Sequence, residues 1–405
     1  MKIKFHKKIL IYYLFVVVFM PPQCLYSING TGNITKLLAA VRYVSSILTI
    51  LYAAVNNRAK KDVLKPYVLC SFSAIILQIL ALYMNKTIYL TAALSCVTFI
   101  GFLEINILCW NRNKGKLLLA YKNIIYTYAF IHFVTLLVCS NGLVDGYSGD
   151  GRVFFMGTKN TVTSYIILAL LAEYLYWTIK GDKRKRLRKV AKSIVMLNLF
   201  VLLNGSATAM AIVGIIDIYF IMEIVFSGSL KFRKQVEQLF LIVLAITIVV
   251  FFGGIVLQSG GDNPIVGAIT AVFGKDITFN GRTAIWEAAI VNIAEHPLWG
   301  MGLGVKYDVW GNYRFVYSAH NTILEYGVKY GCISLAFFLF SLFMAVRILV
   351  KKWGSEEIRF CLLIMLSIIL SSMFEAMDGY YAFWSILFIP YLFSNVEHFA
   401  ASERI

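Results

Sequence analysis

Two arginines and a histidine are the side chains of this sequence best suited to charge chemistry. Arg282 and Arg314 carry guanidinium groups, whose forked donors match phosphate and carboxylate oxygens. His320 follows them and directly precedes an apolar segment, and an imidazole can give or take a proton near neutral pH. A single histidine at a helix end is often structural, so the two nearby arginines are what favours a catalytic interpretation.

Three glycines lie between the two arginines at alternate positions: Gly300, Gly302 and Gly304. A backbone without side chains can approach a ligand closely and turn its N–H groups toward an anion. Dinucleotide-binding loops share this spacing, but no strand–turn–helix pattern surrounds it here, and we discount that use. Substrate binding by this backbone and a plain flexible loop both remain open.

Acidic and aromatic side chains near the same region are further candidates for sugar contact. Glu375 and Asp378 follow a later apolar segment, although solvation of a helix end is the simpler explanation for them. Tyr307, Trp310 and Tyr317 could stack on sugar rings, while aromatic residues of this kind also mark membrane interfaces. The sequence has no Cys/His spacing or acidic cluster typical of a metal site, and we predict neither a metal nor another cofactor.

The composition indicates what kind of structure must hold these side chains. Of 405 residues, 60% are hydrophobic and 15% are charged, and the mean hydropathy is +0.74. A soluble domain has roughly 45–50% apolar and about 25% charged residues. This composition excludes a soluble globular protein, a disordered chain and a small disulfide-stapled secreted module.

Long apolar runs recur along the whole chain, separated by polar breaks. The runs are continuous rather than alternating, which predicts membrane-spanning helices and excludes a β-barrel. We therefore predict an all-α polytopic membrane protein with about twelve transmembrane helices. The predicted spans cover residues 9–27, 37–55, 67–84, 88–110, 120–139, 161–179, 190–203, 209–226, 237–257, 321–349, 358–376 and 381–399.

Basic residues are distributed unequally between alternate connections of these spans. One set of connections contains 25 Lys and Arg residues and the other contains 8. The positive-inside rule places the basic set, and with it both chain termini, in the cytoplasm. The basic run 183–189 resembles a nucleic-acid signal in isolation, but as a short loop between spans it serves to anchor the topology. We predict no nucleic-acid partner.

The longest connection lies outside the membrane and precedes the tenth span. The chain thus divides into helices one to nine (1–257), the external loop (258–320) and helices ten to twelve (321–405). Within the loop, the pattern after Thr283 predicts an amphipathic helix from 284 to 295. Tryptophans at its flanks fit a position on the membrane surface, and capping of the helical bundle is a compatible alternative.

Glycines in the tenth predicted span could leave space beneath His320. Gly327 and Gly331 follow that histidine by 7 and 11 residues, which returns near the same face of a continuous helix. This small-residue spacing lets a neighbouring helix or a lipid tail pack closely.

The segment that contains these residues resembles the O-antigen polymerase and ligase superfamily (Wzy/WaaL type). The resemblance covers about 280–335 and rests on Gly281 to Trp286, His296 to Gly304, His320 with Asn321, and Gly331 ten positions beyond Asn321. The rest of the chain agrees in architecture. An external Ser-Arg element of that family would fall at Gly205–Thr208, where the arginine is absent, and Ser334 stands where the ligase pattern more often has Gly, Thr or Tyr.

The resemblance implies a metal-independent membrane glycosyltransferase in the bacterial plasma (inner) membrane, with its active site outside. Its donor would be an oligosaccharide on undecaprenyl pyrophosphate, and a flippase and a chain-length regulator are the implied protein partners. We expect a polymerase of O-antigen or capsular repeat units, with an O-antigen ligase as the alternative. His320, Arg282 and Arg314 are the expected catalytic residues. The expected substrate contacts are Gly300, Gly302, Gly304, Asn321, Tyr317 and Glu375.

A protein of another class would be a transporter or a flippase for lipid-linked glycans. Such a protein favours ionisable side chains near the middle of the membrane and broken helices in paired halves. Few charges fall within the predicted spans, and no internal repeat is evident. The sequence therefore favours the enzyme.

Overall fold

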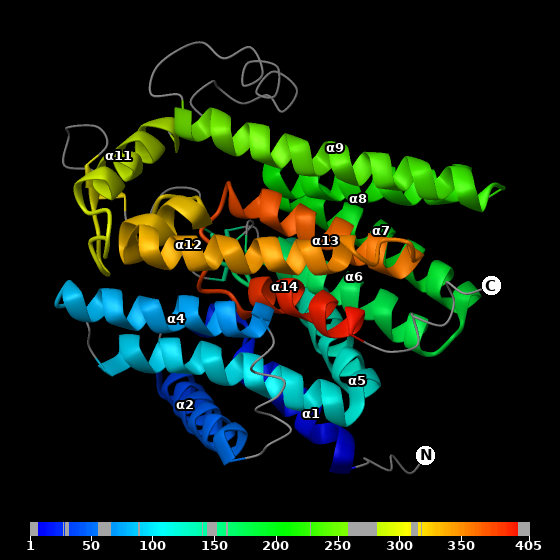
Figure 1. The fold of residues 1–405 in the computed structure, drawn as a ribbon. Helices are drawn as coiled ribbons and strands as arrows, with labels where there is room; N and C mark the ends of the chain where they lie inside the picture. Colours follow the sequence, from blue (N-terminus) through cyan, green and yellow to red (C-terminus); the bar gives the residue numbers. More distant parts are fainter. Residues whose placement is uncertain are drawn as a thin grey trace.

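The computed structural model shows a bundle of helices that run side by side (Figure 1). It describes residues 7–26, 28, 32–55, 66–87, 90–139, 141–143, 152–158, 161–226, 228–257, 282–308, 315–316 and 318–395. The helices are α1 (Lys7–Phe19), α2 (Gly32–Val55), α4 (Pro66–Met84), α5 (Leu90–Val138), α6 (Val162–Ile179), α7 (Lys183–Asn204), α8 (Ala207–Val225), α9 (Leu230–Leu257), α11 (Arg282–Glu295), α12 (Thr322–Val350), α13 (Glu356–Ser372) and α14 (Tyr381–Ser394). A 3-10 helix (Gln23–Tyr26) and two antiparallel strands, β1 (Tyr307–Asp308) and β2 (Phe315–Val316), complete the described elements.

The all-helical, multi-pass membrane character predicted from the sequence is supported by the helices themselves. Within the described ranges, five helices are long and apolar enough to cross a membrane: α2, α5, α6, α8 and α12. Each of the twelve predicted spans overlaps a described helix. The span count, the orientation and the division into three regions stay predictions.

The boundaries agree with the sequence prediction at one place and differ from it at another. The element α5 consists of two helices that meet at a break at Asn113, where φ is −166° and ψ is 90°. This break falls between the spans predicted at 88–110 and 120–139. The basic run 183–189 is helical rather than a loop, since α7 begins at Lys183. Asp182 caps this helix by accepting a hydrogen bond from the Lys185 amide at 2.9 Å, and that bond, together with the Lys185 ammonium, holds the pKa of Asp182 below its ordinary value.

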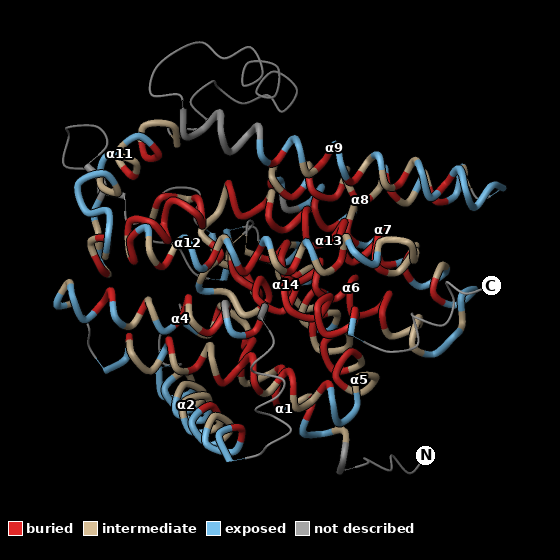
Figure 2. The backbone as a smooth tube through the Cα atoms, in the orientation of Figure 1, coloured by how far each residue is buried: buried red, intermediate tan, exposed pale blue. Residues whose placement is uncertain are grey.

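The centre of the bundle consists of helices that are apolar on all sides. Nearly every residue of α13 and α14 is buried, as is most of α6 (Figure 2). By contrast, α2 presents apolar side chains outward along most of its length. A helix that is apolar all round and buried belongs in a core, whereas exposed apolar faces on the outer helices suit contact with lipid.

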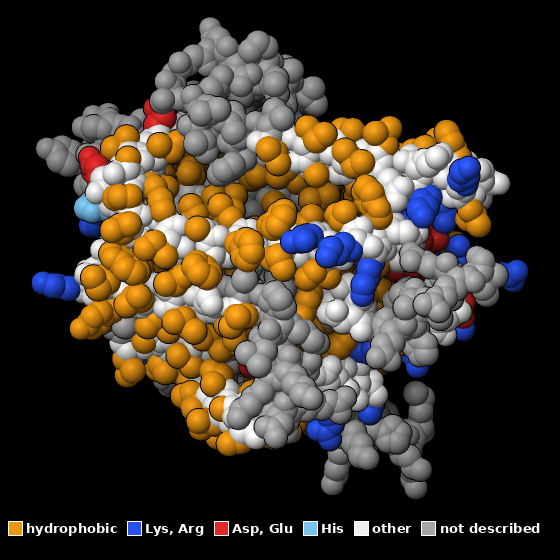
Figure 3. All heavy atoms as spheres, viewed as in Figure 1, with side chains coloured by type: hydrophobic (Ala, Val, Ile, Leu, Met, Phe, Trp, Pro, Cys, Tyr) orange, Lys and Arg blue, Asp and Glu red, His pale blue; other side chains and the backbone are white. Residues whose placement is uncertain are grey.

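The two ends of the bundle differ in charge. In the view of Figure 3, Lys and Arg side chains gather over the end opposite to α11. At that end a cluster of buried ion pairs joins α7, α9 and α13, and we call it the basic-end cluster. Its pairs include Arg186–Glu356, Arg359–Glu237 at 2.5 Å, Arg186–Glu357 at 2.7 Å and Arg233–Glu356 at 2.8 Å.

Candidate functional site

Three segments that are distant in sequence meet at the α11 end of the bundle. They are the start of α11, the turn before α12 and the connection between α13 and α14 (373–380). Arg282 Nη2 donates to Glu375 Oε1 at 2.9 Å, and the same guanidinium donates to the carbonyl of Phe374. The other carboxylate oxygen of Glu375 lies 3.8 Å from His320 Nδ1. We call these three residues the Arg282–Glu375–His320 cluster.

The histidine of this cluster remains accessible while the other two side chains are more enclosed. His320 is 40% exposed, against 20% for Arg282 and 14% for Glu375. The carboxylate is a negative charge placed between a guanidinium and an imidazole. It therefore offsets the charge of Arg282 and lies on the Nδ1 side of the His320 ring.

Helix α11 is fixed in place by packing against α12. Ile285, Trp286 and Ala289 are buried on one face of α11, and they contact Leu324 and Val328 of α12. The buried face of α11 thus packs on the end of the bundle. The helix begins at Arg282 rather than at residue 284, so Thr283 lies in its first turn.

The Trp286 side chain lies inside the protein and not at the membrane surface, where its place beside the predicted helix would put it. Its side chain is buried, and its indole N–H donates to the carbonyl of Ala319 at 3.0 Å. Because Ala319 directly precedes His320, this hydrogen bond links α11 to the turn that carries the histidine. A buried indole usually forms a hydrogen bond through its N–H. Here that hydrogen bond helps to position His320, a catalytic candidate.

The turn at His320 has an unusual backbone conformation. The φ angle of His320 is +48°, in the left-handed region that side-chain-bearing residues seldom occupy. Its N–H donates to Ser318 Oγ at 3.1 Å, and the N–H of Ala319 donates to the carboxylate of Glu325 at 2.6 Å. Such strain persists only where the surroundings hold it, and it clusters at functional sites.

Thr322 ties the α13–α14 connection to the same turn. Its hydroxyl donates to the carbonyl of Glu375 at 2.7 Å and accepts from the N–H of Met377 at 2.8 Å. The backbone that carries the Glu375 carboxylate is therefore held against the first residue of α12. The sequence alone gave no signal for this contact, since a threonine in the first helical turn is ordinary.

Asn321, predicted as a substrate contact, lies inside the protein. It is fully buried, and its side-chain oxygen caps α12 by accepting from the N–H groups of Ile323 and Leu324 at 3.0 and 3.1 Å. This capping fixes the direction in which α12 leaves the His320 turn. The structure thus places Asn321 behind the histidine rather than on an accessible surface.

A second polar group lies one turn further along α12. The ammonium of Lys329 is 2.7 Å from Glu325 and 3.8 Å from Asp378, which belongs to the α13–α14 connection. Glu325 and Lys329 were not predicted as site residues, although their spacing of four on a helix is a recognisable pairing signal. Together with Thr322, they attach the connection to α12 at several points.

The loop that contains the predicted glycines lies against α12 at a break in that helix. The φ of Gly331 is +76° and its ψ is 174°, so α12 is interrupted there. The N–H that follows the break, at Cys332, donates to the carbonyl of Pro297 at 2.7 Å, and Met301 donates to the carbonyl of Val328 at 2.7 Å. The assumption of a continuous helical face from His320 through Gly331 is wrong, because the backbone turns away at Gly331.

The three loop glycines were expected to let the backbone approach a ligand closely. At two of them, Gly300 and Gly302, the backbone instead approaches other parts of the protein. A Cβ on Gly300 would lie 2.4 Å from the Val328 carbonyl oxygen, and one on Gly302 would lie 2.2 Å from Thr87 Oγ1. A Cβ on Gly304 would meet nothing within 4 Å. The structure therefore gives Gly300 and Gly302 a packing reason and leaves Gly304 beside open space.

A cavity of about 290 Å³ adjoins the same α13–α14 connection. It lies between α4, α5, α12 and α14, and its lining includes Gln78, Ser95, Leu303 and Asp378. None of the three residues of the Arg282–Glu375–His320 cluster lines it. Burial, followed by the charge of Glu375, raises the pKa of nearby Tyr380 to about 12, so this phenol stays protonated at neutral pH.

Two predicted site residues, Arg314 and Tyr317, lie outside the described residues. They flank β2, whose Val316 pairs with Tyr307 of β1. Over the described ranges, no group of three or more His, Cys, Asp or Glu side chains is placed to hold a metal ion. The structure therefore unites Arg282, His320 and Glu375, and it leaves Arg314 and Tyr317 as predictions.

Part of the chain matches the model of a known protein family. Residues 192–339 match the family model described as O-antigen ligase. This match is consistent with the resemblance to the O-antigen polymerase and ligase superfamily and confirms it for that stretch. It contains Arg282, the glycine loop and His320, while Glu375 lies beyond it. No curated protein matches the chain.

Proposed function

We propose that this chain, which carries an O-antigen ligase family domain over residues 192–339, is a polymerase of lipid-linked polysaccharide repeat units. It would transfer a glycan from undecaprenyl pyrophosphate onto a second lipid-linked repeat unit, at the outer face of the plasma membrane. The observation that carries this proposal is the meeting of Arg282, Glu375 and His320, two of which lie within the family match.

The proposed reaction has one bond formed and one bond broken. The acceptor hydroxyl oxygen attacks the anomeric carbon of the donor sugar, and a new glycosidic bond forms. The bond between that carbon and the pyrophosphate oxygen breaks, and its electron pair leaves with undecaprenyl pyrophosphate. The hydroxyl proton passes to a base of the protein, for which His320 is the accessible candidate.

His320 would act as the base through its second ring nitrogen. Glu375 faces Nδ1 at 3.8 Å, and a carboxylate on that side stabilises both the required tautomer and the imidazolium that forms. Glu375 is then a positioning residue. A well-placed general base typically contributes about 100- to 10,000-fold in rate, so loss of His320 should nearly abolish transfer.

Arg282 would stabilise the negative charge on the departing pyrophosphate. Its guanidinium is oriented by Glu375 Oε1 and by the carbonyl of Phe374, and a preorganised donor is worth most where charge develops in the transition state. On the basis of the sequence alone, we propose that Arg314 also stabilises the negative charge of the departing pyrophosphate. The cavity beside Asp378 offers room near the cluster for part of a substrate.

An O-antigen ligase is the second candidate, because the matching family model carries that description. Ser334 weakens this candidate slightly, because the ligase pattern more often has Gly, Thr or Tyr at that position. In this structure the Ser334 hydroxyl is buried and donates to the carbonyl of Ala74 at 3.2 Å. The distinction between the two activities concerns the acceptor. A polymerase uses a lipid-linked repeat, and a ligase uses a lipid A core or another acceptor.

The decisive experiment examines the surface glycan of the native host by gel electrophoresis. We expect His320→Ala and Arg282→Ala to remove the ladder of long chains and to leave a single capped repeat. Glu375→Gln should lower the amount of long chains without changing the repeat itself. Glu287→Gln, an exposed carboxylate on the same helix as Arg282, is the matched control and should leave the ladder intact.

Three other outcomes would each contradict the proposal, once the variants are shown to reach the membrane at normal levels. Long glycan stranded on the carrier lipid in the His320→Ala strain would establish the ligase instead. Absence of any lipid-linked glycan on the outer leaflet would indicate a flippase. A normal ladder from both His320→Ala and Arg282→Ala would refute the catalytic assignment.

A further inference from the structure

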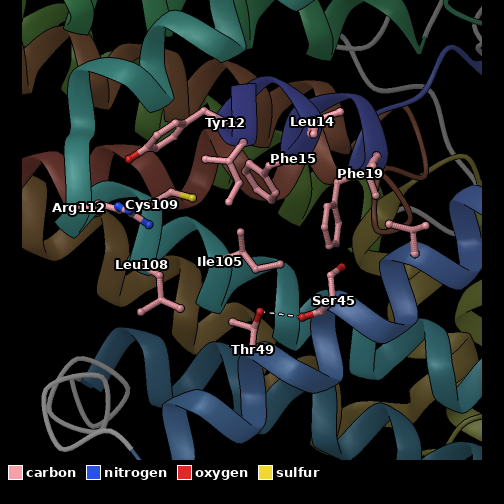
Figure 4. A pocket seen from close by; sticks show the side chains of 13 residues that line it. Tyr12, Leu14, Phe15, Phe19, Ser45, Thr49, Ile105, Leu108, Cys109 and Arg112 are labelled. Carbon is pink, nitrogen blue, oxygen red and sulfur yellow. Dashed lines mark hydrogen bonds between the residues drawn. The ribbon is translucent and has the colours of Figure 1, made fainter. Parts of the chain in front are cut away.

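An apolar groove lies between α1, α2 and α5, at a distance in the fold from the candidate site. Figure 4 shows its walls: Tyr12, Phe15 and Phe19 from α1, with Ser45 from α2 and Ile105 from α5 among the other labelled residues. Its volume is about 360 Å³, and thirteen residues line it. It is concave, unlike the exposed apolar faces that α2 presents elsewhere.

The length of the groove matches one leaflet of a bilayer. Along α1 the lining runs from Ile11 to Phe19, and along α2 it runs from Val41 to Thr49. Eight residues of helix rise about 12 Å, and half of a hydrocarbon core about 30 Å thick is about 15 Å. A single lipid tail entering from one side of the membrane would therefore fill the groove from end to end.

One end of the groove is polar and carries a cation. Arg112 lies there with Tyr12, whereas Phe19 lies at the other end (Figure 4). None of the thirteen lining residues is acidic, and Arg112 is exposed. Arg112 belongs to a basic connection with Lys114 and Lys116, which the charge distribution places on the cytoplasmic side.

The inner part of the groove also contains hydroxyl groups, but their hydrogen-bonding capacity is directed inward. The Thr49 hydroxyl donates to the Ser45 carbonyl at 2.7 Å, and the Ser45 hydroxyl donates to the Arg42 carbonyl at 3.1 Å. These side chains therefore satisfy their donors within α2 and present methyl and methylene surface to the groove. The lining suits a hydrocarbon chain rather than a sugar or a peptide.

We propose that this groove binds an anionic phospholipid of the cytoplasmic leaflet, with one acyl chain in the groove and the phosphate against the Arg112 guanidinium. Basic positions between transmembrane helices at the cytoplasmic side recognise anionic headgroups, and a guanidinium fork matches phosphate oxygens. The bound lipid would fill the space between α1 and α2, and α2 has few other contacts in the bundle apart from α5. This site is separate from glycan transfer and does not depend on the proposed function.

The test measures lipid binding by the full-length protein in phosphatidylcholine nanodiscs that contain increasing phosphatidylglycerol of the same acyl chains. Native mass spectrometry of the released protein counts the retained lipids. The variant Arg112→Gln removes the cation, and Ser45→Leu fills the groove. Arg188→Gln, an exposed arginine at the same end of the bundle but outside the groove, is the matched control.

We expect the wild-type protein and Arg188→Gln to retain phosphatidylglycerol in preference to phosphatidylcholine. Arg112→Gln should lose about fivefold of this preference, the change expected for one cation near an anionic lipid, and should still retain lipid of either kind. Ser45→Leu should lose the retained lipid altogether. Equal preference in Arg112→Gln and Arg188→Gln, or no preference in the wild type, would overturn the proposal.

Discussion

The His320 side chain owes its position to contacts that its neighbours make. Trp286 holds the Ala319 carbonyl on one side, and Glu325 holds the Ala319 N–H on the other. His320 itself adopts a φ of +48° between them. Holding the backbone in this conformation costs free energy. The same conformation leaves the His320 imidazole exposed and places it 3.8 Å from Glu375. At this scale the site is a strained turn fastened by buried hydrogen bonds.

The glycine loop yields a prediction that separates backbone strain from packing. Gly300 and Gly304 have similar φ values, +66° and +80°, so alanine at either position pays about 1–2 kcal/mol for the left-handed conformation. Only at Gly300 would the new Cβ also meet backbone, at 2.4 Å from the Val328 carbonyl oxygen. Thermal unfolding of the purified protein should therefore show a clearly larger loss for Gly300→Ala than for Gly304→Ala. Equal losses would mean that the loop moves freely against α12.

At the scale of elements, the two ends of the bundle are fastened in different ways. The α11 end combines apolar packing and single hydrogen bonds with two separate ion-pair contacts to the α13–α14 connection, Arg282–Glu375 and Lys329–Asp378. The opposite end relies on the basic-end cluster, in which Arg233 reaches Glu356 of α13 at 2.8 Å and Glu237 of its own helix at 3.4 Å. This cluster was not predicted, because its charges looked in the sequence like ordinary topology signals.

The basic-end cluster predicts that one arginine of α9 is structural and its neighbour is not. Arg233→Met removes the cation that Glu237 shares with Arg359 and that Glu356 shares with Arg186, and it should lower the free energy of unfolding by about 3 kcal/mol. Lys234→Met, at an exposed position next to it, should change that value by less than about 0.5 kcal/mol. Chemical denaturation in detergent compares the two variants. Similar stability in both would show that the ion pairs contribute nothing net.

At the scale of the whole molecule, the arrangement separates a cationic end from an end that carries the candidate site. Figure 3 shows the basic side chains over the end opposite to α11, which agrees with the alternation of 25 and 8 basic residues between connections. The Arg282–Glu375–His320 cluster would then face outside, where a translocated lipid-linked glycan is accessible. The lipid groove would open toward the other side of the membrane.

Reporter fusions test this orientation directly. Alkaline phosphatase fused after Lys306, beside β1, should be active, because the positive-inside rule places this position outside. Green fluorescent protein fused after Lys352, between α12 and α13, should fluoresce, because that position is predicted to be cytoplasmic. Reversed activities at the two positions would invert the topology and move the candidate site to the cytoplasm.

The sequence by itself determined the features that depend on local chemistry. Continuous apolar runs predicted helices where the structure has them, and Arg282 and His320 were recognised from their residue types and their place in a long connection. Local patterns suffice for these features because a spanning helix satisfies its hydrogen bonds within its own segment. The break at Asn113 falls in the connection predicted between the spans 88–110 and 120–139. The break at Gly331 was not predictable in the same way, since the surrounding residues favour helix on both sides.

Only the tertiary structure decided which side chains act together. Arg282 and Glu375 are 93 residues apart, and nothing in either local sequence names the other as its partner. The tertiary structure buries Trp286 and gives its indole N–H a partner. It also brings Gly300 and Gly331 together in one close contact between two backbone segments. Such pairings follow from how helices pack, because burial leaves each polar group and each crowded backbone with a single partner that fits.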